Sequence, residues 1–94
     1  MAVRLGVFRS LDAIRPARLS VFADRVEVTR SYGRVVRTLR INYEALSSLQ
    51  VVVTEGSTSV VMVDGQGVVH ALAMPRSDAW RVRALIESVW KPRS

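Results

Sequence analysis

The chain has 94 residues, of which 49% are hydrophobic and 23% are charged, and its net charge at pH 7 is +6. This length and apolar content indicate one small globular domain, folded around a core that removes about 60–65% of the unfolded chain's surface from water. Because cysteine is absent, disulfides and thiolate zinc sites are excluded, and no apolar run approaches the roughly 20 residues of a membrane-spanning helix.

The first half of the chain predicts strands joined by tight turns. Turn residues separate runs that are rich in β-branched and aromatic side chains, notably at Asp24 and at Gly33, where a positive φ is expected. The expected strands are residues 3–8, 19–23, 26–30 and 35–41. Tyr43, Leu46 and Leu49 are three residues apart, which predicts a loop or one helical turn over residues 42–48.

The second half predicts three more strands and one helix. The expected strands are residues 49–54, 58–63 and 68–74, with a strong hairpin signal at Asp64-Gly65. Pro75 ends the last strand, and Ser77 or Asp78 is the expected N-cap of an amphipathic helix that Pro92 ends. Turns every 8–12 residues or so are typical of a small sandwich or barrel. We therefore expect one domain over residues 1–94, mainly β with one C-terminal α-helix, and with its core in residues 19–90.

Local sequence in the middle of the chain resembles bacterial pleckstrin-homology-like domains. Arg25-Val26-Glu27-Val28 and Gly33-Arg34 precede the segment Ile41-Asn42-Tyr43-Glu44-Ala45-Leu46-Ser47-Ser48-Leu49. The resemblance implies a bent barrel or sandwich of about seven strands, with its open corner capped by the C-terminal helix. The residues expected to plug that corner are Tyr43, Val82, Ile86 and Trp90.

No catalytic or cofactor-binding motif stands out in the chain. His70 is the one histidine and lies in a strand-like run, without a cysteine, a second histidine or a carboxylate pair nearby in sequence. No serine lies in a nucleophile motif, and Gly65-Gln66-Gly67 lacks the rest of a phosphate-binding loop. The sequence therefore predicts a non-enzymatic protein without a metal or another cofactor.

Arginine accounts for thirteen of the fourteen basic residues, which is typical either of a GC-rich bacterial or phage genome or of a surface that grips anions. The candidate anion-binding residues are Arg15, Arg18, Arg25, Arg34 and Arg37. The two-residue period of a strand places Arg37 on the face of Val35 and Leu39, and Arg40 on the opposite face. A solvated surface, a surface for acidic lipid or phosphate and, less favoured, a nucleic-acid surface remain as alternatives.

Valine-rich strands in the second half suggest an interface. The runs around Val52 and around Val60 and Met62 are apolar on both faces, so each strand needs a second covering surface, from the helix or from another subunit. Our leading hypothesis is a cytoplasmic, self-associating protein-interaction or scaffold module whose contacts include Val52, Val60 and Met62. The alternative is a basic module that docks on acidic lipid headgroups or on nucleic acid.

Overall fold

The computed structural model describes residues 3–12 and 16–90, and it contains seven strands and one α-helix in this part of the chain. Sheet A consists of β1 (Arg4–Arg9), β2 (Ala17–Phe22), β3 (Arg25–Tyr32) and β4 (Val35–Asn42). A 3-10 turn, η1 (Tyr43–Ala45), leads to sheet B, which consists of β5 (Leu46–Thr54), β6 (Ser57–Asp64) and β7 (Val69–Ala73). Helix α1 (Arg76–Val89) follows. The predicted class, mainly β with one C-terminal helix, is confirmed.

Both sheets are antiparallel meanders, in which strands that follow one another in the chain also pair with one another. Short turns between consecutive strands allow this order. At the β3–β4 turn, Gly33 has the expected positive φ, at 64°. The meander leaves β4 at one edge of sheet A and β7 at one edge of sheet B, each paired on one side only within the described residues.

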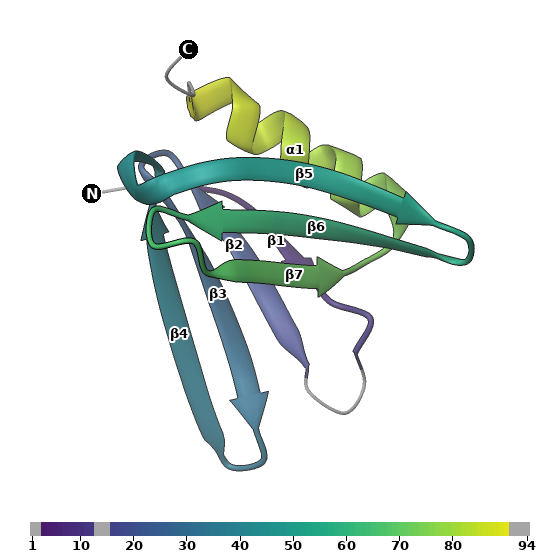
Figure 1. Ribbon diagram of the computed structural model, residues 1–94. Coiled ribbons are helices and arrows are strands. Elements are labelled where there is room, and N and C mark those ends of the chain that lie inside the picture. Colours follow the sequence, from purple (N-terminus) through teal and green to yellow (C-terminus); the bar gives the residue numbers. More distant parts are fainter. Residues whose placement is uncertain (1–2, 13–15, 91–94) are drawn as a thin grey trace.

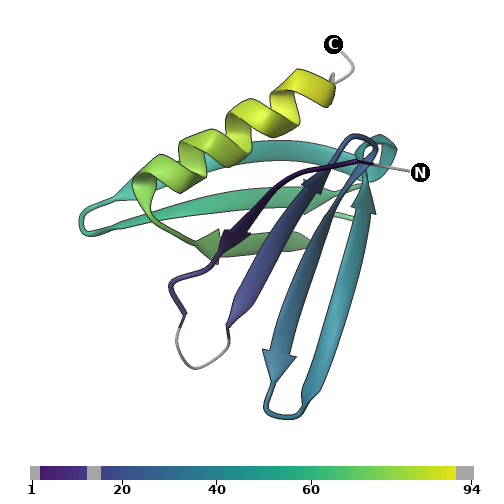
Figure 2. The same cartoon turned by 180° about the vertical axis from the view of Figure 1, so that it is seen from behind.

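The two sheets are splayed, and their strands run in clearly different directions (Figure 1). Sheet A and α1 both lie on the same side of sheet B, behind it in Figure 1 and in front of it in the reverse view of Figure 2. The sheets are not closed into a barrel, which corrects the barrel alternative and leaves an open two-sheet sandwich. Closure would require strand pairing between the sheets, and the sheet order contains none in the described chain.

The core lies between the inner faces of the sheets and α1. Alternate residues of β2 and β3 point into it, and Leu19, Val21 and Val26 are fully buried. From sheet B, Val60, Met62 and Leu72 complete the buried cluster. This arrangement leaves the opposite face of each sheet without a covering layer from the described chain.

Helix α1 packs against the core where the two sheets meet. It contacts β5 and β6 of sheet B on one side, and β1 and β2 of sheet A on the other. Val82 and Ile86 are fully buried, and Tyr43 and Trp90 pack partly buried against the same cluster, so the four predicted plug residues all contact the core. The backbone N–H of Trp90 donates to the carbonyl of Ile86 at 2.7 Å where the helix ends.

The helix begins earlier than predicted, because its N-cap is Pro75 rather than Ser77 or Asp78. Pro75 makes no side-chain capping bond, but its extended backbone leads directly into the first turn at Arg76. Asp78 instead lies within that first turn, where its negative charge interacts favourably with the positive end of the helix dipole. In the described residues, no helix is long and apolar enough to cross a membrane.

Candidate functional site

Strand pairing shows which side chains share a face, because residues directly opposite one another on neighbouring strands point the same way. Arg18 and Arg25 lie on the outer face of sheet A, Arg34 lies in the β3–β4 turn, and Arg37 lies on the inner face opposite Arg30. Arg15 is outside the described residues. The four described candidates therefore do not form one anion site, which corrects that grouping.

The outer face of sheet A is strongly basic. Its charged residues in the described chain are Arg4, Arg9, Arg18, Arg25, Arg40 and Glu27. Glu27 is bonded to Arg25 at 2.6 Å and lies 3.5 Å from Arg40, whereas Arg9 and Arg18 are exposed and directly opposite one another. The uncompensated positive charge of this face is therefore centred on β1 and β2.

The outer face of sheet B carries no charged side chain in the described chain. Its residues are Ser48, Gln50, Val52, Thr54, Ser57, Ser59, Val61, Val63, Val69, Ala71 and Ala73. Val52 and Val69 are 38% and 60% exposed, and Val61 and Val63 are half-buried between them. This face is turned toward the viewer in Figure 1, where neither α1 nor sheet A covers it. We call this face the neutral surface.

Only one of the three predicted interface residues lies on this neutral surface. Val52 is on the outer face, but Val60 and Met62 are 0% exposed and belong to the core. Met62 pairs with Leu49 and with His70 across the inner face of sheet B. Their assignment to an interface is therefore wrong, and their neighbours on β6, Val61 and Val63, hold the outward positions.

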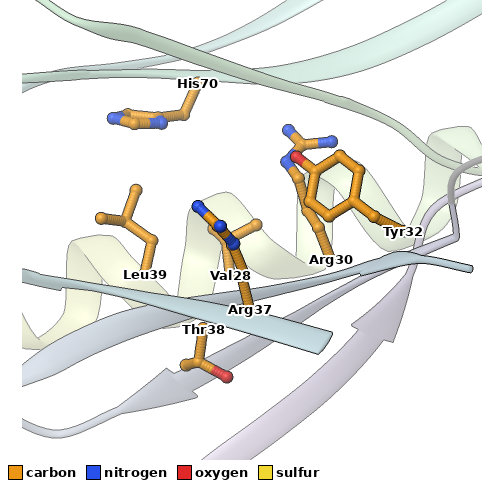
Figure 3. Close-up of a pocket in the computed structure, with 7 residues that line it drawn as sticks. All are labelled: Val28, Arg30, Tyr32, Arg37, Thr38, Leu39 and His70. Carbon is orange, nitrogen blue, oxygen red and sulfur yellow. The ribbon is translucent and has the colours of Figure 1, made fainter. Parts of the chain in front are cut away.

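A groove of about 340 Å³ opens between the β3–β4 hairpin and β7. Its lining residues are Val28, Arg30, Tyr32, Arg37, Thr38, Leu39 and His70. Figure 3 shows the side chains of Val28, Arg30, Arg37 and Leu39 directed from the hairpin toward the side of His70, while Thr38 points the other way. The groove is thus the uncovered continuation of the inner face of sheet A.

The opening follows from the angle between the two sheets. The strands of sheet B cross the β3–β4 hairpin near the core, and the part of the hairpin next to its turn continues past β7 (Figure 1). Near the core the inner residues Val28 and Ile41 are buried, but toward the turn Tyr32, Val35 and Leu39 are 46%, 52% and 43% exposed. The hairpin therefore extends beyond the layer that would cover it, as Figure 1 shows.

His70 enters the groove from β7 and is held by Asp64. Its Nε2 atom lies 3.1 Å from Oδ2 of Asp64, and the other carboxylate oxygen accepts the backbone N–H groups of Gln66 and Val68 at 2.9 and 3.0 Å. These hydrogen bonds hold the pKa of Asp64 below its ordinary value, and the bond with His70 has the largest effect. The pair orients the imidazole and fixes the β6–β7 turn.

The chemistry available at His70 is limited to that pair. No group of three or more histidine, aspartate and glutamate side chains is placed to bind a metal ion within the described ranges. Among the residues that the structure describes, the groove lining contains no serine, aspartate or glutamate that would form a catalytic relay with the imidazole.

The sequence interpretation missed both the groove and the neutral surface as connected features. Counting back from the turn at Gly33 pairs Tyr32 with Val35 and Arg30 with Arg37, so the hairpin half of the groove was accessible from sequence. His70 was not, because it joins the groove through the packing of one sheet against the other.

Comparison with known proteins gives no match to a family model, to a curated protein or to a solved structure.

Proposed function

We propose that the chain is a non-enzymatic protein-interaction module with a pleckstrin-homology-like fold, and that it self-associates through the outer face of sheet B. The order of four strands, three strands and a C-terminal helix supports this fold. The absence of charge from the outer face of sheet B carries the proposal of self-association. Interface centres are depleted of charged residues in the same way.

The occupant of this face is a second copy of the chain, packed sheet against sheet. Two such faces stack about 10 Å apart with aligned strands, and the valines of one fit between those of the other. From strand spacing the face covers roughly 400 Å². That is about half of the roughly 800 Å² per partner in a standard interface, so the dimer should be weak and concentration-dependent.

Salt should strengthen this dimer. Each copy carries a net charge of +6, and the two copies repel one another at low ionic strength. Raising the salt from about 0.1 M to about 0.5 M shortens the screening length and leaves the apolar contact in place. Association bridged by anions would show the opposite dependence.

Val61→Asp is the direct test, because Val61 lies on the central strand of the neutral face, opposite Gln50 and Ala71. Sedimentation from about 10 μM to about 1 mM should show the wild-type mass rising toward that of a dimer, while the variant stays monomeric. Thr38→Asp, the matched control, adds the same charge to the outer face of sheet A and should associate like wild type. A wild-type monomer at the highest concentration, or an unaffected Val61→Asp variant, would refute the proposal.

The basic outer face of sheet A favours a second function, docking on a membrane surface that contains anionic lipid. Arg9 and Arg18 face one another across β1 and β2 without an intervening acid, and a sheet face suits a planar partner. Each arginine at such a surface contributes about 1 kcal/mol. Arg34 and Arg37 lie off that face, so this second function rests on Arg9 and Arg18 instead.

Co-sedimentation with vesicles that contain phosphatidylserine tests this second function. Replacing Arg9 and Arg18 together by glutamine should weaken binding roughly ten- to thirtyfold, and binding by the wild type should fall steeply between about 0.1 M and 0.5 M salt. The matched double variant, Arg34→Gln with Arg37→Gln, removes the same charge elsewhere and should bind nearly as well as wild type. Equal losses in the two double variants would mean that net charge alone attracts the protein to vesicles.

A further inference from the structure

We propose that the groove between the β3–β4 hairpin and β7 binds an extended, acidic segment of another protein, which adds a strand to the edge of β4. This surface lies on the inner face of sheet A, away from the neutral outer face of sheet B. The proposal therefore goes beyond self-association and does not depend on it.

The backbone of β4 supplies the first requirement. In an antiparallel pair, every second residue of an edge strand directs its N–H and C=O groups away from its partner. Because β4 pairs only with β3 in the described chain, those groups are available to an added strand. Such added strands gain affinity from main-chain hydrogen bonds and specificity from alternate side chains.

The apolar side chains of the hairpin supply the second requirement. Tyr32, Val35 and Leu39 lie on the inner face and remain between two-fifths and about half exposed. Side chains of an added strand that point inward would cover Val35 and Leu39 against the wall formed by Val28 and His70. The added strand would thus extend the core along the uncovered part of the hairpin.

Charge decides the chemistry of the occupant. Arg30 and Arg37 are directly opposite one another on the inner face, and neither has an ion pair with another described residue. Within the described part of the chain, the one hydrogen bond of the Arg30 side chain is to the carbonyl oxygen of Ala71 on β7, at 3.4 Å. No acidic side chain of the described residues lines the groove. Two like charges on opposing positions repel, and a carboxylate between them would be attracted by both.

The register of β4 then defines the occupant's pattern. Leu39, Arg37 and Val35 are two residues apart along the inner face, so the residues beside them in an added strand also alternate. The segment should carry an acidic residue beside Arg37, with apolar residues two positions before and after it. A glutamate reaches either arginine, whereas a shift of one position turns it away from the groove.

The peptide Ser-Val-Ser-Glu-Ser-Val-Ser, acetylated and amidated, is the probe. Titrated into ¹⁵N-labelled protein up to about 1 mM, it should shift amide signals of β4 and β7. The isomer Ser-Val-Glu-Ser-Ser-Val-Ser has the same composition and charge but the wrong alternation, and it should bind at least about fivefold more weakly. Both titrations are repeated in the Val61→Asp variant, so the result does not depend on whether the chain self-associates.

Arg37→Gln and Arg40→Gln are the matched protein variants, since these residues lie on one strand but on opposite faces. Arg37→Gln should weaken the probe about five- to tenfold, and Arg40→Gln less than about twofold. Absence of shifts at the highest peptide concentration, equal binding of the isomer, or equal effects of the two variants would overturn the proposal. So would a short single-stranded DNA that shifts the same groove signals more strongly than the peptide does, since it would assign the groove to nucleic acid.

Discussion

Replacing Ile86 by alanine is expected to lower the free energy of unfolding by about 2–5 kcal/mol. Ile86 is fully buried on the face of α1 that packs into the core between the sheets. Alanine is the better helix former, so the loss reports packing rather than helix propensity. For a 94-residue domain, whose total stability is roughly 5–14 kcal/mol, this is a large fraction. Urea unfolding followed by far-ultraviolet circular dichroism measures it.

Trp80→Ala is the matched control on the same helix. It removes a larger side chain, but Trp80 is 41% exposed, and the guanidinium of Arg83 lies over its ring, 5.5 Å from the ring centre. We expect a loss below about 1 kcal/mol, because surface substitutions seldom cost more. If Trp80→Ala proved more destabilising than Ile86→Ala, the assignment of the buried face of α1 would be contradicted.

Much of the fold was predictable because its elements are local in sequence. The turn at Gly33 and the hairpin signal at Asp64-Gly65 bound strands that the structure reproduces within a few residues. The apolar period of the helix correctly selected Val82 and Ile86 as buried residues. The helix start was misplaced because a side-chain cap was expected, while Pro75 starts the helix through its backbone conformation.

What sequence left open depends on packing between the sheets. An apolar run such as residues 60–63 shows that both faces of a strand are apolar, but it does not say which face meets the core. The packing of sheet B against sheet A and α1 decides this, and it buries Val60 and Met62 while Val61 lies on the outer face. Barrel closure is likewise a property of sheet edges far apart in the chain. For the same reason, the sequence did not predict that His70 lies in one groove with Arg30 and Arg37.

Three surfaces of different chemistry therefore lie on one small scaffold. The outer face of sheet A concentrates arginines, the outer face of sheet B is neutral, and the groove combines exposed apolar side chains with Arg30 and Arg37. Separation by strand face lets a neutral contact exist on a chain of net charge +6. A dimer through sheet B would leave both basic surfaces accessible, so self-association and capture of an acidic partner are compatible.

The connection between the sheets provides the second large prediction, at Tyr43. Its hydroxyl donates to the backbone carbonyl of Phe22 at 2.5 Å and ties η1 to the end of β2. In Tyr43→Phe that carbonyl loses the hydrogen bond from the phenol in a partly buried site, which should cost about 1–3 kcal/mol at pH 7. Tyr32→Phe makes the same chemical change at an exposed side chain and should cost much less.

The effect of Tyr43→Phe should also depend on pH. Burial, and secondarily the negative charge of Asp24, raises the pKa of Tyr43 from 10.0 to about 12. Between these values the unfolded chain releases the phenolic proton while the folded protein keeps it, so this contribution to stability is complete below pH 10 and declines toward pH 12. The stability difference between wild type and Tyr43→Phe should therefore shrink over that range, as measured by urea unfolding of both proteins. A difference that stays constant from about pH 9 to about pH 12 would show that Tyr43 ionises equally in both states.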